Sequence, residues 1–356
     1  MKTFRKINVL SACLVLASSF AFVACSQIDD DNSDCEIDFQ GSYRMSLITN
    51  EELEIKRVLG DSLNGIAVDL REHLKDVFID YGRDINMAYY ALPDSVATQP
   101  LRGSLPTEMN AIERSFEVFM PIYDYMHTVT ANLQGNGPVA LENASSCHGA
   151  RLSVNMNEIN ANDVTSHRTC IYSGRKLLTG MTFGPQRYDF NLYMVNCADA
   201  IILDPRTAQF TNVEVFTHGF ANSFSVCDSV YHYDYNTVVR SDRVNLRNTN
   251  WLGFCSVNLP SKEPTSYTRL RQEVDEPFFR YDDSGEDIWF YDCRVTMANG
   301  SITRTLLSIR HPLRAGQLKI ILGYIDDEGV VRIYDAEVGT SIDLDWEPSY
   351  VFHPFG

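Results

Sequence analysis

The fold class is decided by residues 289–309, whose sequence is WFYDCRVTMANGSITRTLLSI. Apolar and polar side chains alternate from Trp289 to Met297, an Asn299-Gly300 pair follows, and a second strand-like run covers residues 302–309. Alternation with a period of two is typical of a strand with one buried face. An Asn-Gly pair suits the positive backbone angles of a type I′ turn, so the segment is predicted to form a β-hairpin.

The same signal recurs along both halves of the chain. Residues 37–47 alternate cleanly and predict a half-buried strand, with Gly41 as a candidate bulge. Further strands are predicted for residues 77–81, 85–91, 115–120, 126–133, 190–195, 201–203, 213–216, 231–239, 318–324 and 330–338. Loops and edge strands are also expected in the polar segment that follows Pro138. With these edge strands, each half contains about seven short strands, which is the pattern of antiparallel Greek-key β-sandwiches.

The sequence predicts only two short helices. Residues 51–59 and 69–76 are the helix candidates, and Asp69 with Glu72 is expected to form a capping box in the second of them. Residues 92–106 contain three prolines and are predicted to form a loop. An all-β fold with few short helices follows.

Residues 1–24 have the features of a lipoprotein signal peptide. Three basic residues (Lys2, Arg5 and Lys6) precede a short apolar run that ends in Phe22-Val23-Ala24, directly before Cys25. A basic head, a short apolar core and small residues before the cut mark a secretory signal. The run is shorter than the roughly 20 residues that a membrane-spanning helix needs. A cysteine directly after Val-Ala is what bacterial lipoprotein processing requires, so we expect Cys25 to be diacylated and to become the first residue.

Two other interpretations of this segment exist. One is a plain secretory signal in which Cys25 is incidental. The other uses Leu10-Ser11-Ala12-Cys13, which matches the lipobox consensus even better. That choice leaves almost no apolar core upstream of the cut, so Cys25 is the favoured lipidation site.

Residues 25–35 form an acidic tether that contains Asp29, Asp30, Asp31 and Asp34. Such a stretch is expected to stay solvated because it has little apolar surface to bury. The folded part is then divided near Gly184-Pro185 into an N-terminal sandwich, residues 36–185, and a C-terminal sandwich, residues 186–356.

The chain is strongly acidic, with 30 basic and 47 acidic residues. Without the three basic residues of the signal, 27 basic residues face 47 acidic ones, a net charge of −20. This charge disfavours nucleic acid and anionic lipid headgroups as partners. Attachment to a membrane is therefore expected to depend on the lipid.

Seven cysteines remain after removal of the signal and acylation of Cys25, so at least one thiol is expected to be free or paired between chains. Their spacing contains no zinc pattern. Cys147 and Cys170 are predicted to form a disulfide, whereas Cys197 and Cys293 are expected to act as small core residues.

The sequence contains none of the motifs that would indicate catalysis or a bound cofactor, such as G-x-S-x-G, H-E-x-x-H or a phosphate loop. We therefore expect no catalytic residues, no metal and no cofactor. Tyr231-His232-Tyr233 could offer a sugar-stacking surface, but a strand edge that packs its aromatic rings is the favoured interpretation. The acidic segments 282–287 and 326–329 are interpreted as solvated turns rather than calcium loops.

Several segments resemble the FimB-type anchor subunits of type V pili. They are the lipobox cysteine with its acidic tether, the first strand at Cys35–Phe39, the segment Val77–Gly82, the pair Phe116–Leu133 with Met120-Pro121, Tyr123 and Tyr125, and the segment Tyr188–Leu203. One departure is Met-Pro-Ile-Tyr at residues 120–123, where the family often has Pro-Gly-Tyr before a strand with tryptophan.

The resemblance implies two transthyretin-like domains and a role at the base of a fimbrium. The chain would be a surface-exposed lipoprotein of the outer membrane that joins a stalk subunit by β-strand addition, in which main-chain hydrogen bonds give affinity. Stalk subunits lose their first strand by proteolysis after a basic residue, whereas an anchor keeps it. Arg44 and Lys56-Arg57 lie where such a cut could occur, so anchor, stalk and tip roles stay open at this point. A surface glycan-binding lipoprotein with a host or glycan ligand is the alternative function, and a secreted enzyme with a dispersed site is a third.

Overall fold

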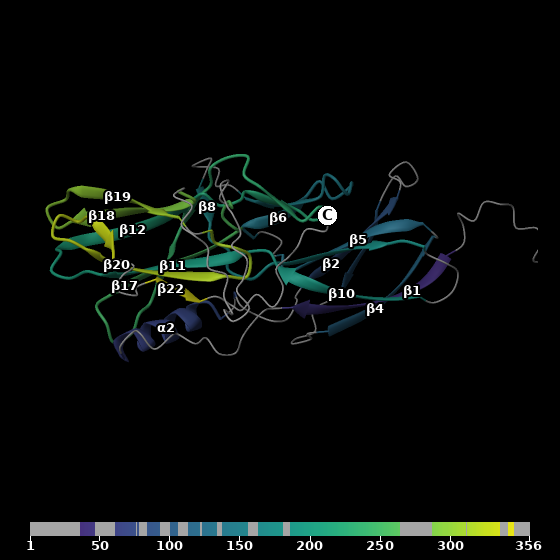
Figure 1. Ribbon diagram of the computed structural model, residues 1–356, viewed down its shortest axis with the longest axis horizontal. Coiled ribbons are helices and arrows are strands. Elements are labelled where there is room, and N and C mark those ends of the chain that lie inside the picture. Colours follow the sequence, from purple (N-terminus) through teal and green to yellow (C-terminus); the bar gives the residue numbers. More distant parts are fainter. Residues whose placement is uncertain are drawn as a thin grey trace, which may run out of the picture.

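The chain folds into an elongated molecule whose described elements are almost all strands (Figure 1). The computed structural model describes residues 36–46, 61–75, 77, 84–92, 100–105, 113–121, 123–133, 137–155, 163–180, 186–263, 287–310, 312–334 and 341–344. Within these ranges α2 (Asp61–His73) is the single helix. The prediction of an all-β protein built from antiparallel sheets is confirmed.

The strands divide at the middle of the chain into two runs. The first contains β1 (Glu36–Ser46), β2 (Ile85–Leu92), β3 (Leu101–Leu105), β4 (Glu113–Pro121), β5 (Asp124–Ala131), β6 (Val139–Glu142), β7 (Arg151–Val154), β8 (Asp163–Thr165), β9 (Tyr172–Leu178) and β10 (Gln186–Met194). The second contains β11 (Cys197–Asp204), β12 (Phe210–His218), β13 (Ser223–Ser225), β14 (Val230–His232), β15 (Val238–Arg240), β16 (Asp242–Val244), β17 (Leu252–Asn258), β18 (Trp289–Met297), β19 (Ile302–Ile309), β20 (Leu318–Ile325), β21 (Val331–Ile333) and β22 (Ser341–Leu344).

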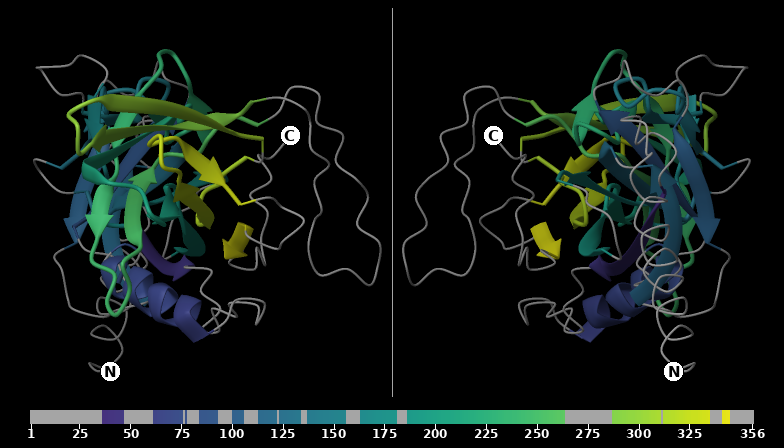
Figure 2. Two further views of the ribbon diagram at one scale, coloured as in Figure 1. Left: turned by 90° about the vertical axis from the view of Figure 1, so that its left-hand side faces the viewer. Right: turned by 90° about the vertical axis from the view of Figure 1, so that its right-hand side faces the viewer.

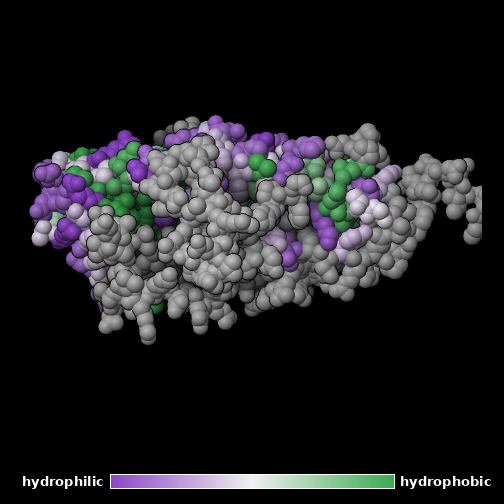
Figure 3. All heavy atoms as spheres, in the orientation of Figure 1, coloured by the Kyte–Doolittle hydropathy of each residue, from purple (hydrophilic) through white to green (hydrophobic). Residues whose placement is uncertain are grey.

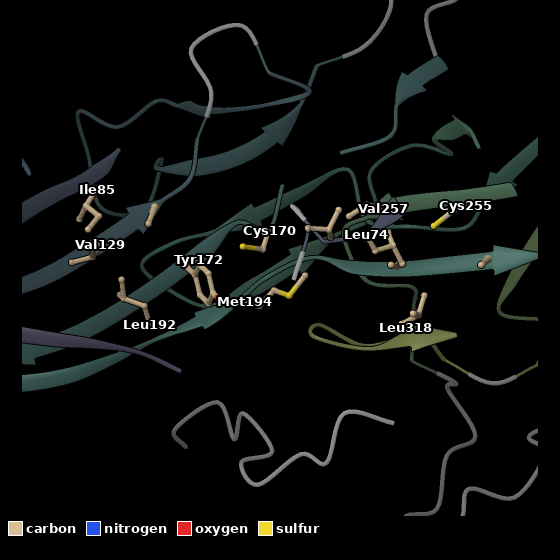
Figure 4. Close-up of a cluster of buried hydrophobic side chains, with 14 of the residues drawn as sticks. Leu74, Ile85, Val129, Cys170, Tyr172, Leu192, Met194, Cys255, Val257 and Leu318 are labelled. Atoms are coloured by element: carbon tan, nitrogen blue, oxygen red, sulfur yellow. The ribbon is translucent and has the colours of Figure 1, made fainter. Parts of the chain in front are cut away.

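A seven-stranded sheet of order β3-β2-β5-β9-β10-β1-β4 forms one end of the molecule. Strands β9 and β10 share only two residue pairs, Tyr193 with Ser173 and Met194 with Tyr172. Such short pairing lets the sheet bend, and Figure 1 shows β5 above β1 and β4. Val129 of β5 and Leu192 of β10 are fully buried in one hydrophobic core between the layers (Figure 4).

The other end is a sandwich of two sheets. A five-stranded sheet of order β19-β18-β12-β15-β8 faces a six-stranded sheet of order β16-β17-β11-β20-β21, in which β22 also pairs with β20. Trp289 is completely buried between them, with its ring centroid 5.0 Å from that of Tyr291 and 5.3 Å from that of Phe220. The alternating residues of β18 thus form the inner face that the sequence predicts.

Strand β11 is buried on both faces. Cys197, Ile201 and Leu203 belong to the core around Trp289, whereas the alternate residues belong to the core that contains α2. Those alternate residues are Ala198, Ala200 and Ile202. A continuous apolar run is what a strand covered on both faces requires. The helix therefore covers the outer face of the six-stranded sheet, below it in Figures 1 and 2.

Helix α2 differs from its prediction, because it begins at Asp61 and not at Asp69. Ile66, Leu70 and Leu74 form its buried stripe. Asp69 is only 5% exposed, and its carboxylate accepts hydrogen bonds of 2.6 Å from the backbone N–H and the Nε of Arg247. It holds the helix to the segment after β16 instead of capping it. The predicted helix at 51–59 lies outside the described residues.

Other predictions about the elements need correction. The expected loop 92–106 contains β3, an edge strand whose side chains from Leu101 to Ser104 are all exposed, which removes the alternation that marks a strand. The register of β1 runs through Gly41 without a shift, so no bulge forms there. The expected strand 231–239 is divided into β14 and β15, and Val77 lies in a turn.

The hairpin of β18 and β19 is confirmed, but its turn is not type I′. Of the two turn residues, Gly300 has a positive φ of +84°, whereas the φ of Asn299 is not positive. Met297 donates to the carbonyl of Ser301 and Gly300 donates to that of Met297. This is the three-residue loop in which a type I turn is followed by a left-handed glycine. The turn before β21 repeats this arrangement, with Gly329 at φ +80°.

Sheets join the two halves of the sequence on either side of Pro185. Strand β10, which begins directly after it, pairs with β1 and β9. A four-stranded sheet of order β14-β13-β7-β6 combines strands from both halves, and β8 pairs with β15. The division of the chain into two domains at this point stays a prediction.

The disulfide joins Cys147 to Cys227, whose Cα atoms are 5.7 Å apart, and not to Cys170. Strand β7 lies between β6 and β13, which brings together the segments that follow those two strands. Cys170 is a buried thiol that accepts a hydrogen bond from Asn132. Cys197 and Cys293 are fully buried and free, as predicted.

A buried carboxyl group lies between the sheets of the sandwich. Asp199 of β11 is completely buried, and its Oδ2 accepts hydrogen bonds from the Ser256 hydroxyl at 2.6 Å and the Asn258 amide at 2.9 Å. Burial raises the pKa of Asp199 to about 7, although these hydrogen bonds act in the opposite direction. The folded state therefore holds a proton that the unfolded state releases near the usual pKa of 3.8.

Asp199 is expected to make the protein less stable as the pH rises from 5 to 8. The folded state binds more protons than the unfolded state between the two pKa values, so stability is lost as pH rises toward the folded pKa. The free energy of unfolding of the wild type, relative to that of Asp199→Asn, is expected to fall by about 2–3 kcal/mol across this window.

Urea denaturation at several pH values measures this difference. Asp228→Asn, at an exposed turn position, is the matched control and is expected to keep the wild-type pH dependence. An identical pH dependence in the wild type and in Asp199→Asn would contradict the prediction.

Candidate functional site

The position of β1 is the feature of the fold with the clearest functional meaning. It lies inside the seven-stranded sheet, parallel to β10 and antiparallel to β4. The ladder to β10 runs from Phe39 to Ser46, and the ladder to β4 runs from Glu36 to Arg44. The prediction of a strand immediately after the acidic tether is confirmed.

No short turn connects β1 to either neighbour. The next described element along the chain is α2, which packs on the other sandwich, and β4 follows only after β2 and β3. The backbone ladders therefore hold β1 in place. Strand β4 in turn has no partner other than β1 among the described strands. The parallel pairing with β10 has no local sequence signal, because it joins segments more than a hundred residues apart in sequence.

A proline–tyrosine corner connects the two layers of this sheet. Strand β4 ends at Pro121 and β5 begins three residues later. The carbonyl of Pro121 accepts hydrogen bonds from the backbone N–H of Tyr123 at 3.1 Å and from the hydroxyl of Tyr125 at 2.9 Å. Tyr125 is 2% exposed, and burial raises its pKa to about 12. The corner thus fixes how β4 leaves the layer of β5 to reach β1.

Of the residues predicted to take part in processing, the structure describes only Arg44. Cys25 and Lys56-Arg57 lie outside the described residues. Arg44 lies within β1 and pairs with Asn191 of β10 and Glu113 of β4. Cleavage after Arg44 would therefore require the end of the strand to leave both neighbours, because a protease binds its substrate as a separate extended segment.

The aromatic segment at β14 packs against the protein, which agrees with the interpretation of Tyr231-His232-Tyr233 as a strand edge. Tyr231 donates to the carbonyl of Val195 at 2.9 Å, and its ring lies 4.8 Å from that of Phe224. Tyr233 donates to the carbonyl of Ser261 at 2.7 Å. Because β14 is the edge of its sheet, these residues form a packed strand edge. Both rings are partly buried against the core beneath.

The acidic turn at 326–329 has a structural role. The carboxylate of Asp326 accepts hydrogen bonds from the backbone N–H groups of Glu328 and Val330 and from Arg332. Of the segment 282–287, the structure describes only Asp287, which pairs with Arg310. Within the described ranges, no three His, Cys, Asp or Glu side chains gather as a metal site would require. No helix in the described part of the chain is long and apolar enough to cross a membrane.

Comparison with known proteins gives remote structural likenesses. No protein-family model matches the chain, and no curated protein does. Among solved structures, a candidate adhesin from Bacteroides ovatus is 12% identical, with 80% of this chain and 86% of that chain covered and a TM-score of 0.46. The fimbrial anchor protein Mfa2 from Porphyromonas gingivalis is 11% identical, with 84% and 97% covered and a TM-score of 0.44. The tip fimbrial protein Mfa3 from the same organism is 8% identical, with 87% and 100% covered and a TM-score of 0.42.

Replacement of Ser42 by proline is expected to weaken the seven-stranded sheet. Ser42 pairs with Asp189 on one side and Ser115 on the other. Proline has no N–H to donate to either ladder. The loss of one ladder bond, which leaves its acceptor without a partner, is expected to cost about 1–3 kcal/mol of unfolding free energy.

Urea denaturation of Ser42→Pro and Ser42→Thr gives the comparison, because threonine keeps the N–H at the same position. Equal stability of the two variants would show that β1 contributes no ladder to the folded sheet.

Proposed function

We propose that this chain is a lipoprotein of the outer membrane that serves as the anchor or a minor subunit of a fimbrium. Its role is structural, in cell adhesion, and involves no catalysis. The observation that carries the proposal is the arrangement at the N-terminus. The lipid-attachment sequence at Cys25 is followed by an acidic tether of about ten residues and then directly by a strand held in the sheet on both sides.

The retained strand supports an anchor in particular. The lipid on Cys25 can hold the folded protein only while β1 and the tether stay joined to the rest of the chain. Two ladders hold β1, so a pull on the tether is transmitted to the sheet. The acidic tether resembles the export signal of surface-facing lipoproteins, and this favours the outer face of the outer membrane.

Assembly with the stalk follows from the same strand. A stalk subunit that has lost its first strand has a gap where β1 lies here. A neighbour can fill such a gap by β-strand addition. This chain keeps its own strand in that place, so it would meet the stalk by supplying a strand to the first stalk subunit. Its partners are therefore a fimbrial stalk subunit and, through the lipid, the outer membrane.

Cys25→Ala is expected to release the protein from the membrane fraction, because removal of the thiol removes the attachment point of the lipid. Cys13→Ala is the matched control, since Cys13 lies in the competing lipobox within the same signal, and it is expected to stay in the membrane fraction. Immunoblots of separated fractions measure both. Retention of Cys25→Ala in the membrane would show that another element anchors the chain.

The mature N-terminus separates an anchor from a stalk or tip subunit. Mass spectrometry of the assembled protein is expected to find acylated Cys25 followed by Ser26. A mature chain that starts after Arg44 or Arg57 would make the protein a stalk or tip subunit.

Removal of the protein from the cell is expected to detach its fimbriae or make them abnormally long, because the base of the stalk then has no attachment. Electron microscopy of cells and of culture supernatant measures fimbrial length and attachment. The control is the same strain that carries the wild-type gene on a plasmid. Normal, cell-attached fimbriae in the deletion strain would contradict the anchor role.

A further inference from the structure

The four-stranded sheet β14-β13-β7-β6 has a small-residue floor on its outer face. The small residues Ala140, Ser153 and Ser223 lie side by side across β6, β7 and β13, and the larger His232 of β14 ends the row. Small side chains in adjacent strands leave a hollow, because side chains stand roughly perpendicular to a sheet. Sequence inspection missed this row, since its members come from four strands that are far apart in sequence.

The opposite face of the same sheet is apolar. Leu141, Leu152, Phe224 and Tyr231 form the next row and pack into the core beneath. The disulfide between Cys147 and Cys227 lies in this same core. The sheet is therefore a rigid support with one buried apolar face and one polar face toward solvent.

A groove with a volume of about 560 Å³ lies over this polar face. Its volume lies within the range of about 300–1,000 Å³ that small-molecule sites occupy. Glu142, Asn143 and His148 line one part, and Asn155, Asp234 and Tyr235 line another. In Figure 3 the upper margin of the molecule is mostly hydrophilic.

The floor contains a polar group without a partner. Ser223 is only 3% exposed, it lines the groove, and its Oγ has no hydrogen-bond partner in the described part of the chain. An unsatisfied buried hydroxyl is unfavourable, and a ligand hydroxyl that reached it would remove the penalty. Arg151 and Asp234 both line the groove and form an ion pair at 3.8 Å, and both are exposed enough that each can also bind a ligand.

The charges of the groove favour a neutral ligand. Glu142 and Asp234 offset Arg151, and the chain as a whole carries a net charge of −17. The negative charge of the groove and of the chain would repel phosphate or sulfate. Two carboxylates are too few for a calcium site, which takes six to eight oxygen ligands. A peptide that adds as a strand needs a free sheet edge, whereas this groove lies on the face of a sheet.

We infer that this groove binds a neutral oligosaccharide. Sugar hydroxyls are both donors and acceptors, and they match the mixed amide, hydroxyl, carboxylate and guanidinium groups of the lining. Tyr235 supplies an amphipathic ring against which the apolar face of a sugar ring can pack. The inference stands apart from the anchor role, because it concerns a different sheet and needs no fimbrial partner.

The test uses the full chain purified in detergent on an array that carries neutral, sialylated and sulfated oligosaccharides. The chain is expected to bind neutral members, and calorimetry with the strongest of them gives the affinity. Tyr235→Ala removes the ring, and Ser153→Leu fills the floor. Each is expected to weaken binding at least about tenfold.

Two matched variants serve as controls. Tyr193→Ala removes a half-exposed tyrosine on β10, and Ser308→Leu places a leucine on the exposed face of β19. Both are expected to keep the affinity within about twofold. Three results would each overturn the inference: the chain binds no neutral member, it binds sialylated or sulfated members alone, or both groove variants keep the wild-type affinity. These outcomes leave the anchor proposal untouched, since that is measured by membrane retention and by fimbriae.

Discussion

The backbone ladders on the two sides of β1 are the interaction on which the N-terminal sheet depends. Among the described strands, β4 is bonded to the sheet through β1 alone. If β1 were withdrawn, β4 would lose its only partner and β10 would lose one of its two. Unpaired main-chain groups are costly where water cannot reach them. The sheet thus requires a strand in this place, from its own chain or from another, which is the physical basis of strand exchange between subunits.

Helix α2 couples this sheet to the far sandwich. It follows β1 in the chain, yet Leu70 and Leu74 pack on the outer face of the six-stranded sheet. The contact between Asp69 and Arg247 joins segments 178 residues apart. The pKa of Asp69 is lowered, because the hydrogen bonds from Arg247 outweigh burial, which by itself would raise it. The strand nearest the tether and the distant sandwich are therefore linked through a short stretch of chain.

Local alternation was enough to predict the elements whose two faces differ. Strands β2, β18 and β19 are of this kind. The buried role of Cys197 and Cys293 was predicted from alternating patterns as well. Strand β3 was missed because its side chains from Leu101 to Ser104 are all exposed. The start of α2 was missed because its buried stripe begins at Ile66, before the predicted cap at Asp69. The disulfide partner of Cys147, the pairing of β1 with β10 and the groove over β7 and β13 arise from contacts between distant segments. No local pattern encodes such contacts.

The two ladders of β1 have a mechanical consequence if the chain is tethered at Cys25, as proposed. A load on such a tether would reach the sheet through β1, which two ladders hold. If the load were directed along the strand, the bonds to β4 and β10 would resist it in shear, with many sharing the force at once, whereas a strand pulled sideways would open one bond at a time. Resistance to forced unfolding depends on the rate of unfolding rather than on equilibrium stability. The geometry of β1 is therefore one that resists a load along the axis of the strand.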